Sequence, residues 1–226
     1  MKSYRISHNR SWLAAVILAV ILTAPTADAL AADLELLGSR WEKPVVTFQI
    51  STKGGISASA IADVVQAIDD WNAALQNVPG APTLTLVTRR NQADVTIDLR
   101  AKETRNVFGG QTALQGGYWS LPETEGCTLV AQSFTMQGYV LTDPRAEGYP
   151  QTRNLARHLV GHALGLGDIA GPNAGTIQDA MRPMGTWESI PATDLAISEC
   201  DLDGIAAVYS AASCEQIPSS VAFDCN

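Results

Sequence analysis

The sequence has 226 residues, of which 46% are hydrophobic and 17% charged, and its formal net charge is −8. A chain of this composition can bury a core, which excludes a wholly disordered protein and predicts one domain or at most two. The acidic balance excludes nucleic-acid binding, because contact with the phosphate backbone requires clustered lysine and arginine.

Residues 1–29 have the three parts of an export signal. Basic residues come first, residues 12–22 are an unbroken apolar run, and Ala27 and Ala29 form the small-x-small pattern of a cleavage site. The apolar run is too short to span a bilayer. An uncleaved membrane anchor is the alternative, but Pro25 and the alanines after it favour cleavage. We therefore expect an exported protein, periplasmic or secreted, with no membrane attachment after cleavage.

The mature chain begins with a strand, a helix and two more strands. Residues 44–50 alternate apolar and polar side chains, as a half-buried strand does. From Ser59 the apolar residues recur at helical spacing, and this helix ends before Pro79. The two-residue alternation returns at residues 84–86 and 95–99, which predicts two further strands.

The middle of the chain predicts a loop followed by strands. Residues 101–126 are rich in glycine, threonine and glutamate and are expected to form a long surface loop. Residues 128–135 and 138–142 are each apolar enough to form a strand.

Two helices are predicted near the end, at residues 152–165 and 199–211. Ser198 can cap the second of them, with Asp201 three residues further on to complete a capping box. Because strands come first and two helices last, the order predicts an α+β domain with one sheet. We assign residues 30–212 to this domain.

Four cysteines, an even number in an exported chain, predict two disulfides. Of the three connectivities we favour Cys214 with Cys225, and Cys127 with Cys200. This arrangement would tether a C-terminal tail of residues 213–226. A zinc site built from cysteines is the alternative, but the sequence has no C-x-x-C pair.

Apart from His8 in the signal, the histidines are His158 and His162. Four residues apart on a helix, they present their imidazoles to the same side. Gly165 allows the chain to leave the helix through a left-handed turn, so Asp168 can return toward the same point. Two nitrogens and one carboxylate leave a fourth position open, as catalytic zinc sites do. The alternative is two core histidines, with Asp168 capping the next turn.

This stretch resembles the zinc helix of metzincin metallopeptidases, H-E-x-x-H-x-x-G-x-x-H, in the form of some bacterial secreted members with aspartate as third ligand. Residues 179–183 resemble the Met-turn, in which a methionine, here Met181, lies beneath the metal. Residues 201–209 resemble the last helix of matrix-metalloproteinase-like domains. The likeness covers roughly residues 40–210.

The resemblance implies a twisted, mainly parallel five-stranded sheet with about three helices, and a cleft in which an extended peptide or protein substrate lies along an edge strand. It implies one zinc ion on His158, His162 and Asp168, which would polarise the scissile carbonyl. No histidine remains for a second zinc site, and calcium is unsupported because Asp143 and Glu147 are too few ligands. We expect a monomer.

The family mechanism also needs a carboxylate that moves the water's proton, supplied by the glutamate after the first histidine. Here that position is Leu159, which cannot exchange a proton. Because positioned acid–base catalysis is worth ~10²–10⁴ in rate, two hypotheses follow: a zinc metalloendopeptidase with impaired or rescued hydrolysis, or a pseudoenzyme that binds peptides without cutting them. A structural domain without metal is a third. The sequence does not exclude Asp179, Glu188 or Glu199 as substitutes for the missing base.

Overall fold

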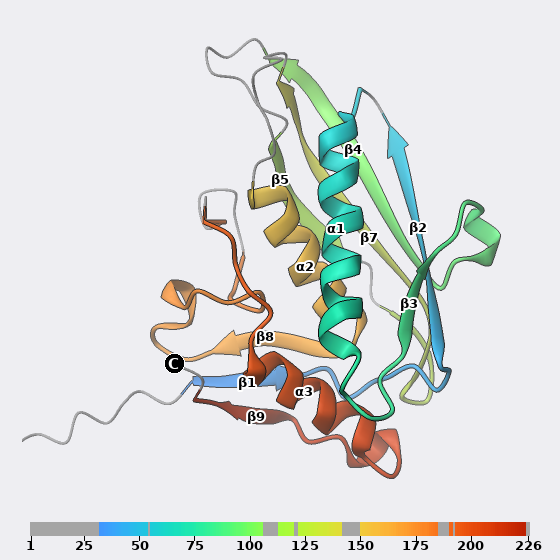
Figure 1. The fold of residues 1–226 in the computed structure, drawn as a ribbon, viewed down its shortest axis with the longest axis vertical. Helices are drawn as coiled ribbons and strands as arrows, with labels where there is room; N and C mark the ends of the chain where they lie inside the picture. Colours follow the sequence, from blue (N-terminus) through green and yellow to red (C-terminus); the bar gives the residue numbers. More distant parts are fainter. Residues whose placement is uncertain are drawn as a thin grey trace, which may run out of the picture.

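The structure is a computed structural model that describes most of the chain after residue 31 (Figure 1). The described residues are 32–53, 55–105, 113–119, 122–141, 150–184, 190–191 and 193–224. The expected signal peptide, residues 1–29, lies outside them. Four other residues named above also lie outside them: Asp143, Glu147, Glu188 and Cys225.

The described residues form three α-helices and nine strands. The helices are α1 (Ala58–Leu75), α2 (Pro150–Ala163) and α3 (Glu199–Ser210). The strands are β1 (Ala32–Leu36), β2 (Val45–Lys53), β3 (Thr83–Leu86), β4 (Val95–Arg105), β5 (Ala113–Trp119), β6 (Glu123–Glu125), β7 (Thr128–Leu141), β8 (Leu166–Ala170) and β9 (Ser220–Phe223). Within this described part, none of the helices combines the length and the apolar character needed to cross a bilayer.

The larger sheet has the strand order β3-β2-β4-β7-β5, and β6 pairs with β7 beside this path. Neighbouring strands from β3 to β7 are parallel, whereas β5 runs antiparallel to β7 and forms one edge. The predicted α+β fold, with a mainly parallel five-stranded sheet and three helices, is therefore confirmed.

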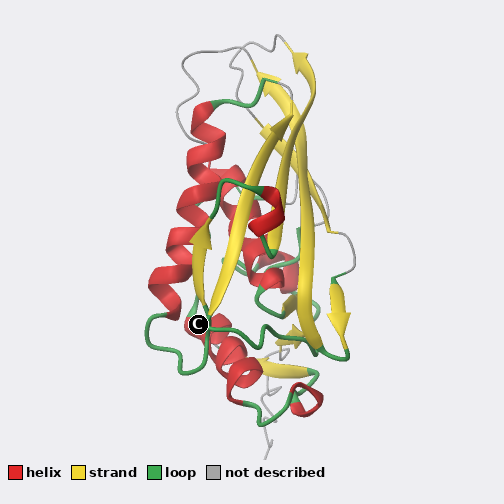
Figure 2. Cartoon of the chain, turned by 90° about the vertical axis from the view of Figure 1, so that its right-hand side faces the viewer, coloured by secondary structure: helices red, strands yellow, loops and turns green. Residues whose placement is uncertain are grey.

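Helices α1 and α2 cover one side of this sheet (Figure 2). Helix α1 begins where the Ser57 side chain accepts a hydrogen bond from the Ala60 N–H, which satisfies one of the free amides of the first turn. Most of its apolar stripe is buried in one core with residues from the strands, and Ile61 is partly buried against that core. The large, fully buried side chains of that core include Trp71 and Ile68 of α1, Leu155 of α2, and Phe48, Ile97 and Phe134 of the sheet.

The prediction of a single sheet was wrong, because β1, β8 and β9 form a second sheet in the order β8-β1-β9. Its strands are antiparallel, and it lies with α3 at the lower end of the molecule in Figure 1. Leu34 and Leu36 of β1 approach Gly204 of α3 closely enough to contact any side chain added there. These three short strands come from distant parts of the chain, so local periodicity did not reveal them.

The predicted loop at residues 101–126 was also wrong. It contains the end of β4, all of β5 and all of β6, and β4 and β5 flank β7 on its two sides. Residues 128–135 and 138–142 were predicted as two strands, but residues 128–141 form the single strand β7, and residue 142 lies outside the described residues. Gly138 does not interrupt it, because that residue pairs with Ala101 on one side and Leu114 on the other. Pairing on both sides overrides glycine's weak strand preference.

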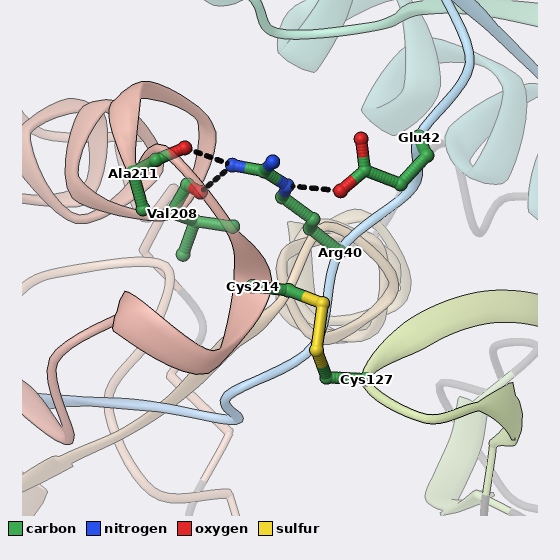
Figure 3. The surroundings of a disulfide bond; sticks show 6 residues. All are labelled: Arg40, Glu42, Cys127, Val208, Ala211 and Cys214. Carbon is green, nitrogen blue, oxygen red and sulfur yellow. Dashed lines mark hydrogen bonds and ion pairs between the residues drawn. A yellow bond between two sulfur atoms is a disulfide. The ribbon is translucent and has the colours of Figure 1, made fainter.

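The favoured disulfide pairing was wrong as well, because Cys127 is bonded to Cys214 (Figure 3). Cys200 is also disulfide-bonded. The two bonded residues are brought together by Arg40, whose backbone N–H donates to the Cys127 carbonyl. The Arg40 guanidinium donates to the carbonyls of Val208 (3.2 Å) and Ala211 at the end of α3.

Helix length explains why Cys127 does not reach Cys200. Cys200 lies in the first turn of α3, whereas Arg40 holds Cys127 against the last turn. A helix of 12 residues is about 18 Å long. The Cα atoms of bonded cysteines lie within about 7 Å, and those of Cys127 and Cys214 are 5.8 Å apart.

Candidate metal centre

Polar contacts with α1 and with Asp194 hold helix α2 in position. The Trp71 indole N–H donates to the Arg157 carbonyl at 2.8 Å, next to His158 in the chain. The Arg157 guanidinium in turn donates to Asp70 at 2.7 Å and to Asp194 at 2.9 Å. These contacts fix the rotation of α2, and they leave the face that carries the histidines directed away from α1.

The chain leaves α2 through a positive-φ turn at Gly165, as predicted, and continues as β8, which was not predicted. Gly165 has φ +100°, a conformation that side chains with a Cβ rarely adopt. A Cβ there would lie 2.6 Å from the Ser39 carbonyl oxygen, so the space is closed as well. Glycine therefore permits both the turn and the close approach of residue 39, and the turn brings Asp168 back to the histidines.

The side chains of His158, His162 and Asp168 converge on one point. The two Nε2 atoms are 2.9 Å apart, and Asp168 Oδ1 lies 3.3 Å from His158 Nε2 and 3.7 Å from His162 Nε2. Both histidines are buried, and Asp168 Oδ1 is buried with no hydrogen-bond partner. The structure thus brings together the three residues that the sequence singled out.

The Nδ1 atoms of the two histidines, which do not take part in the convergence of the Nε2 atoms, determine the protonation of both imidazoles. His158 Nδ1 lies 3.0 Å from the Ala180 carbonyl, and His162 Nδ1 lies 2.9 Å from the Leu166 carbonyl. A carbonyl only accepts, so each Nδ1 carries a proton and each neutral ring directs an Nε2 lone pair inward. Burial lowers the pKa of His158 well below its usual range, and burial also lowers the pKa of His162, so both rings are neutral at pH 7.

Two nitrogen lone pairs and one carboxylate oxygen at this spacing repel one another unless a proton or a metal cation lies between them. Burial raises the pKa of Asp168, and the neighbouring charge of Glu35 raises it further, whereas His162 lowers it. The donor set of two imidazoles and one carboxylate is one that zinc binds, with a fourth position left open. Outer nitrogens held by carbonyls are the usual support for histidine ligands.

Met181 packs beneath α2 between the two histidines. It is fully buried, and a Cβ added to Gly161 would clash with its sulfur. The Met181 carbonyl accepts from the N–H of Ile169, which ties the turn to β8 beside Asp168. The turn that contains Met181 therefore contacts both elements that carry the three candidate ligands.

Two buried carboxyls, those of Asp179 and Asp201, hold this turn in place. Asp179 Oδ1 accepts from the Met181 N–H at 2.7 Å, and Asp201 Oδ2 accepts from the Ser198 N–H at 3.0 Å in the predicted capping box. The two carboxyls lie close enough for the charge of Asp179 to act on Asp201. Burial raises the pKa of Asp179, and burial with the neighbouring charge raises the pKa of Asp201 well above its usual range. The pair therefore holds a proton and fixes the turn whose Ala180 carbonyl accepts from His158.

A pocket of about 280 Å³ opens beside the three candidate ligands. Leu159 lines it, so the position expected to carry a glutamate does face the site, and it is apolar. Of the substitutes considered from sequence, Asp179 is committed to the turn, and Glu199 lies in the first turn of α3. Neither is among the residues that line the pocket in the described part of the chain.

Glu35 of β1 lines the same pocket and was missed by sequence reasoning. Its only sequence signal was the alternation of Leu34, Glu35 and Leu36, which is typical of a strand with one buried face. Nothing local indicated that this strand pairs with β8 and thereby reaches the histidines.

No protein-family model and no curated protein matches this chain. Among solved structures it is similar to high choriolytic enzyme 1, a hatching enzyme zinc-protease from Oryzias latipes (Medaka fish), with 17% sequence identity and a TM-score of 0.27. The match covers 57% of this chain and 50% of the fish enzyme, so the chain spans about half the length of that protein. At this score the similarity carries no argument about activity, which has to come from the residues themselves.

Proposed function

We propose that the chain is an exported zinc metallopeptidase-type protein, with the metal held by His158, His162 and Asp168. One observation carries this proposal: three buried donor atoms, His158 Nε2, His162 Nε2 and Asp168 Oδ1, face one point, and all lie within 4.8 Å of one another. When bound, zinc would polarise a substrate carbonyl and activate water. Zinc is favoured over calcium because two of the three donors are imidazoles.

The surroundings of the site support a peptide as the substrate. The pocket beside the ligands is open, and its wall combines apolar side chains such as Leu37 and Met184 with the carboxylates of Glu35 and Asp168. Strand β5, which lies against α2, is one of the two edge strands of the larger sheet. An edge strand offers free backbone groups to an extended peptide.

Export is supported by two features of the chain. The sequence of residues 1–29 has the pattern of a signal peptide. The bond between Cys127 and Cys214 is of a kind that persists in oxidising compartments and is rare in the cytosol.

The second candidate function is a pseudo-peptidase that binds zinc and peptides without cleavage. Leu159 favours it, because an apolar side chain lines the pocket at the position of the family's proton carrier. The two functions share the metal site and differ only in turnover.

The experiment is to express the full chain for export, sequence the N-terminus of the product and measure its zinc content. The wild type, Leu159→Glu and His162→Ala are then compared on casein and on quenched-fluorescence peptides. We expect about one zinc per chain in the wild type, much less in His162→Ala, and wild-type cleavage above the His162→Ala background. Absence of zinc from the wild type contradicts both candidates. If wild-type cleavage equals the His162→Ala background and Leu159→Glu gains orders of magnitude, the pseudo-peptidase is the candidate that remains.

A further inference from the structure

The pocket beside the candidate ligands contains a second carboxylate. Among the described residues that line it, only Asp168 and Glu35 are acidic, and Asp168 directs Oδ1 at the histidine nitrogens. Glu35 is solvent-exposed. The site therefore has a carboxylate that its ligand set does not use.

A β-bulge brings Glu35 to this position. In the pairing of β1 with β8, Leu34 lies opposite Ile169 and Leu36 lies opposite Leu166. One residue of β1, Glu35, is thus opposite two residues of β8, Gly167 and Asp168. Bulges of this kind re-aim side chains and are frequent beside active sites.

Gly167 and Glu35 lie close together on the same face of the smaller sheet. A Cβ built on Gly167 would lie only 2.7 Å from the Cβ of Glu35, so any larger residue would displace the glutamate. On the opposite face of β1, Leu34 and Leu36 are buried against α3. The burial of these two leucines requires Glu35 to face the pocket.

The strand that carries Glu35 is held on both of its edges. Besides β8 on one side, β9 pairs with β1 on the other, with Glu35 opposite Ser220. A central strand holds a side chain more precisely than a loop does, and such precision is what a group that transfers protons requires.

We propose that Glu35 is the catalytic carboxylate of this site, in place of a glutamate at position 159. This inference rests on the proposed function. The Glu35 carboxylate accepts a proton from the attacking water, whose oxygen bonds to the carbonyl carbon of the peptide. The C–N bond then breaks, and the proton passes from Glu35 to the leaving amine. No proton is gained or lost overall, and no further reactant is needed.

The test compares Glu35→Gln with Asp33→Asn in the full exported chain. Asp33 is a matched control, because it lies on the same strand, is also exposed and loses the same charge, yet does not line the pocket. Both variants are examined for zinc content, for zinc affinity by chelator competition, and for peptide cleavage. We expect both to bind zinc like the wild type, and only Glu35→Gln to lose ~10²–10⁴ in cleavage rate.

A second readout is independent of turnover. Acetohydroxamic acid binds zinc through its two oxygens and passes its hydroxyl proton to a neighbouring carboxylate, so we expect its affinity to fall about 10-fold to 100-fold in Glu35→Gln. The affinity of Asp33→Asn should match the wild type. Equal hydroxamate affinity in Glu35→Gln and wild type overturns the proposal, as does a zinc-loaded wild type that binds no hydroxamate.

Other outcomes separate this inference from the proposed function. Loss of zinc in Glu35→Gln alone would make Glu35 a ligand and overturn its role in proton transfer. A wild type without zinc contradicts the proposed function itself. A zinc-loaded wild type that is inert until Leu159→Glu is introduced overturns the role of Glu35 and leaves the metal site standing.

Discussion

Replacing Gly165 by alanine tests whether the turn between α2 and β8 requires glycine. Two costs are expected from the structure. The first is conformational, since φ is +100° at this residue and an L side chain in this region costs about 1–2 kcal/mol. The second is steric, since the added methyl group would lie 2.6 Å from the Ser39 carbonyl oxygen and 3.3 Å from Val208.

The steric cost is the larger of the two. The Ser39 oxygen belongs to the backbone, so the clash cannot be relieved by a change of rotamer, and overpacking of this kind costs about 1–3 kcal/mol. Alanine recovers about 0.4–1 kcal/mol by restricting the unfolded chain. The expected net loss is about 2–4 kcal/mol, a large part of the 5–15 kcal/mol that is typical of the free energy of unfolding.

The assay is urea unfolding in the presence of a chelator, so that metal binding does not contribute to stability. Gly38→Ala is the matched control, because Gly38 also has a positive φ (+67°) but no atom lies within 4 Å of its added Cβ. Gly38→Ala should lose only the conformational cost. If the two variants lose equal free energies of unfolding, the argument from the Ser39 contact is refuted.

Two further predictions concern the supports of the site. Burial and the charge of Asp179 raise the pKa of Asp201 well above its usual range, so the folded state keeps a proton that the unfolded chain releases. This contribution is full below the ordinary pKa of about 4 and is lost as the pH rises toward the folded value. Urea unfolding between pH 4 and 7 should show the free energy of unfolding fall by up to about 1.4 kcal/mol per pH unit in the wild type and less in Asp201→Asn; identical slopes would contradict the shared proton. The double variant Cys127→Ser and Cys214→Ser should lose about 2–5 kcal/mol, because the bond joins residues 87 apart. An unchanged thermal midpoint would count against that bond.

The candidate ligands were predictable because their geometry is largely local. His158 and His162 share a helix face by their spacing alone, and Gly165 provides the turn that returns Asp168 within six residues of His162. The capping box at Ser198 was predictable for the same reason, since its two partners lie three residues apart. Short sequence separation leaves the chain few alternative arrangements.

The predictions that were wrong concern contacts between residues that are far apart in the sequence. Gly138 in β7 weakens a strand locally, yet two neighbouring strands pair with it there. The partner of Cys127 depends on the Arg40 contacts with the end of α3, which no spacing in the sequence reveals. Glu35 reaches the pocket only because β1 pairs with a strand more than 130 residues away.

The sequence by itself determined the α+β class, the pair of histidines and the absence of a carboxylate at Leu159, because residue identity and helical periodicity act over a few residues. Tertiary structure alone decided which oxygens orient the histidines, which cysteine bonds Cys127 and that Glu35 faces the pocket. These outcomes depend on strand pairing and burial, whose free energy comes from segments far apart in the chain.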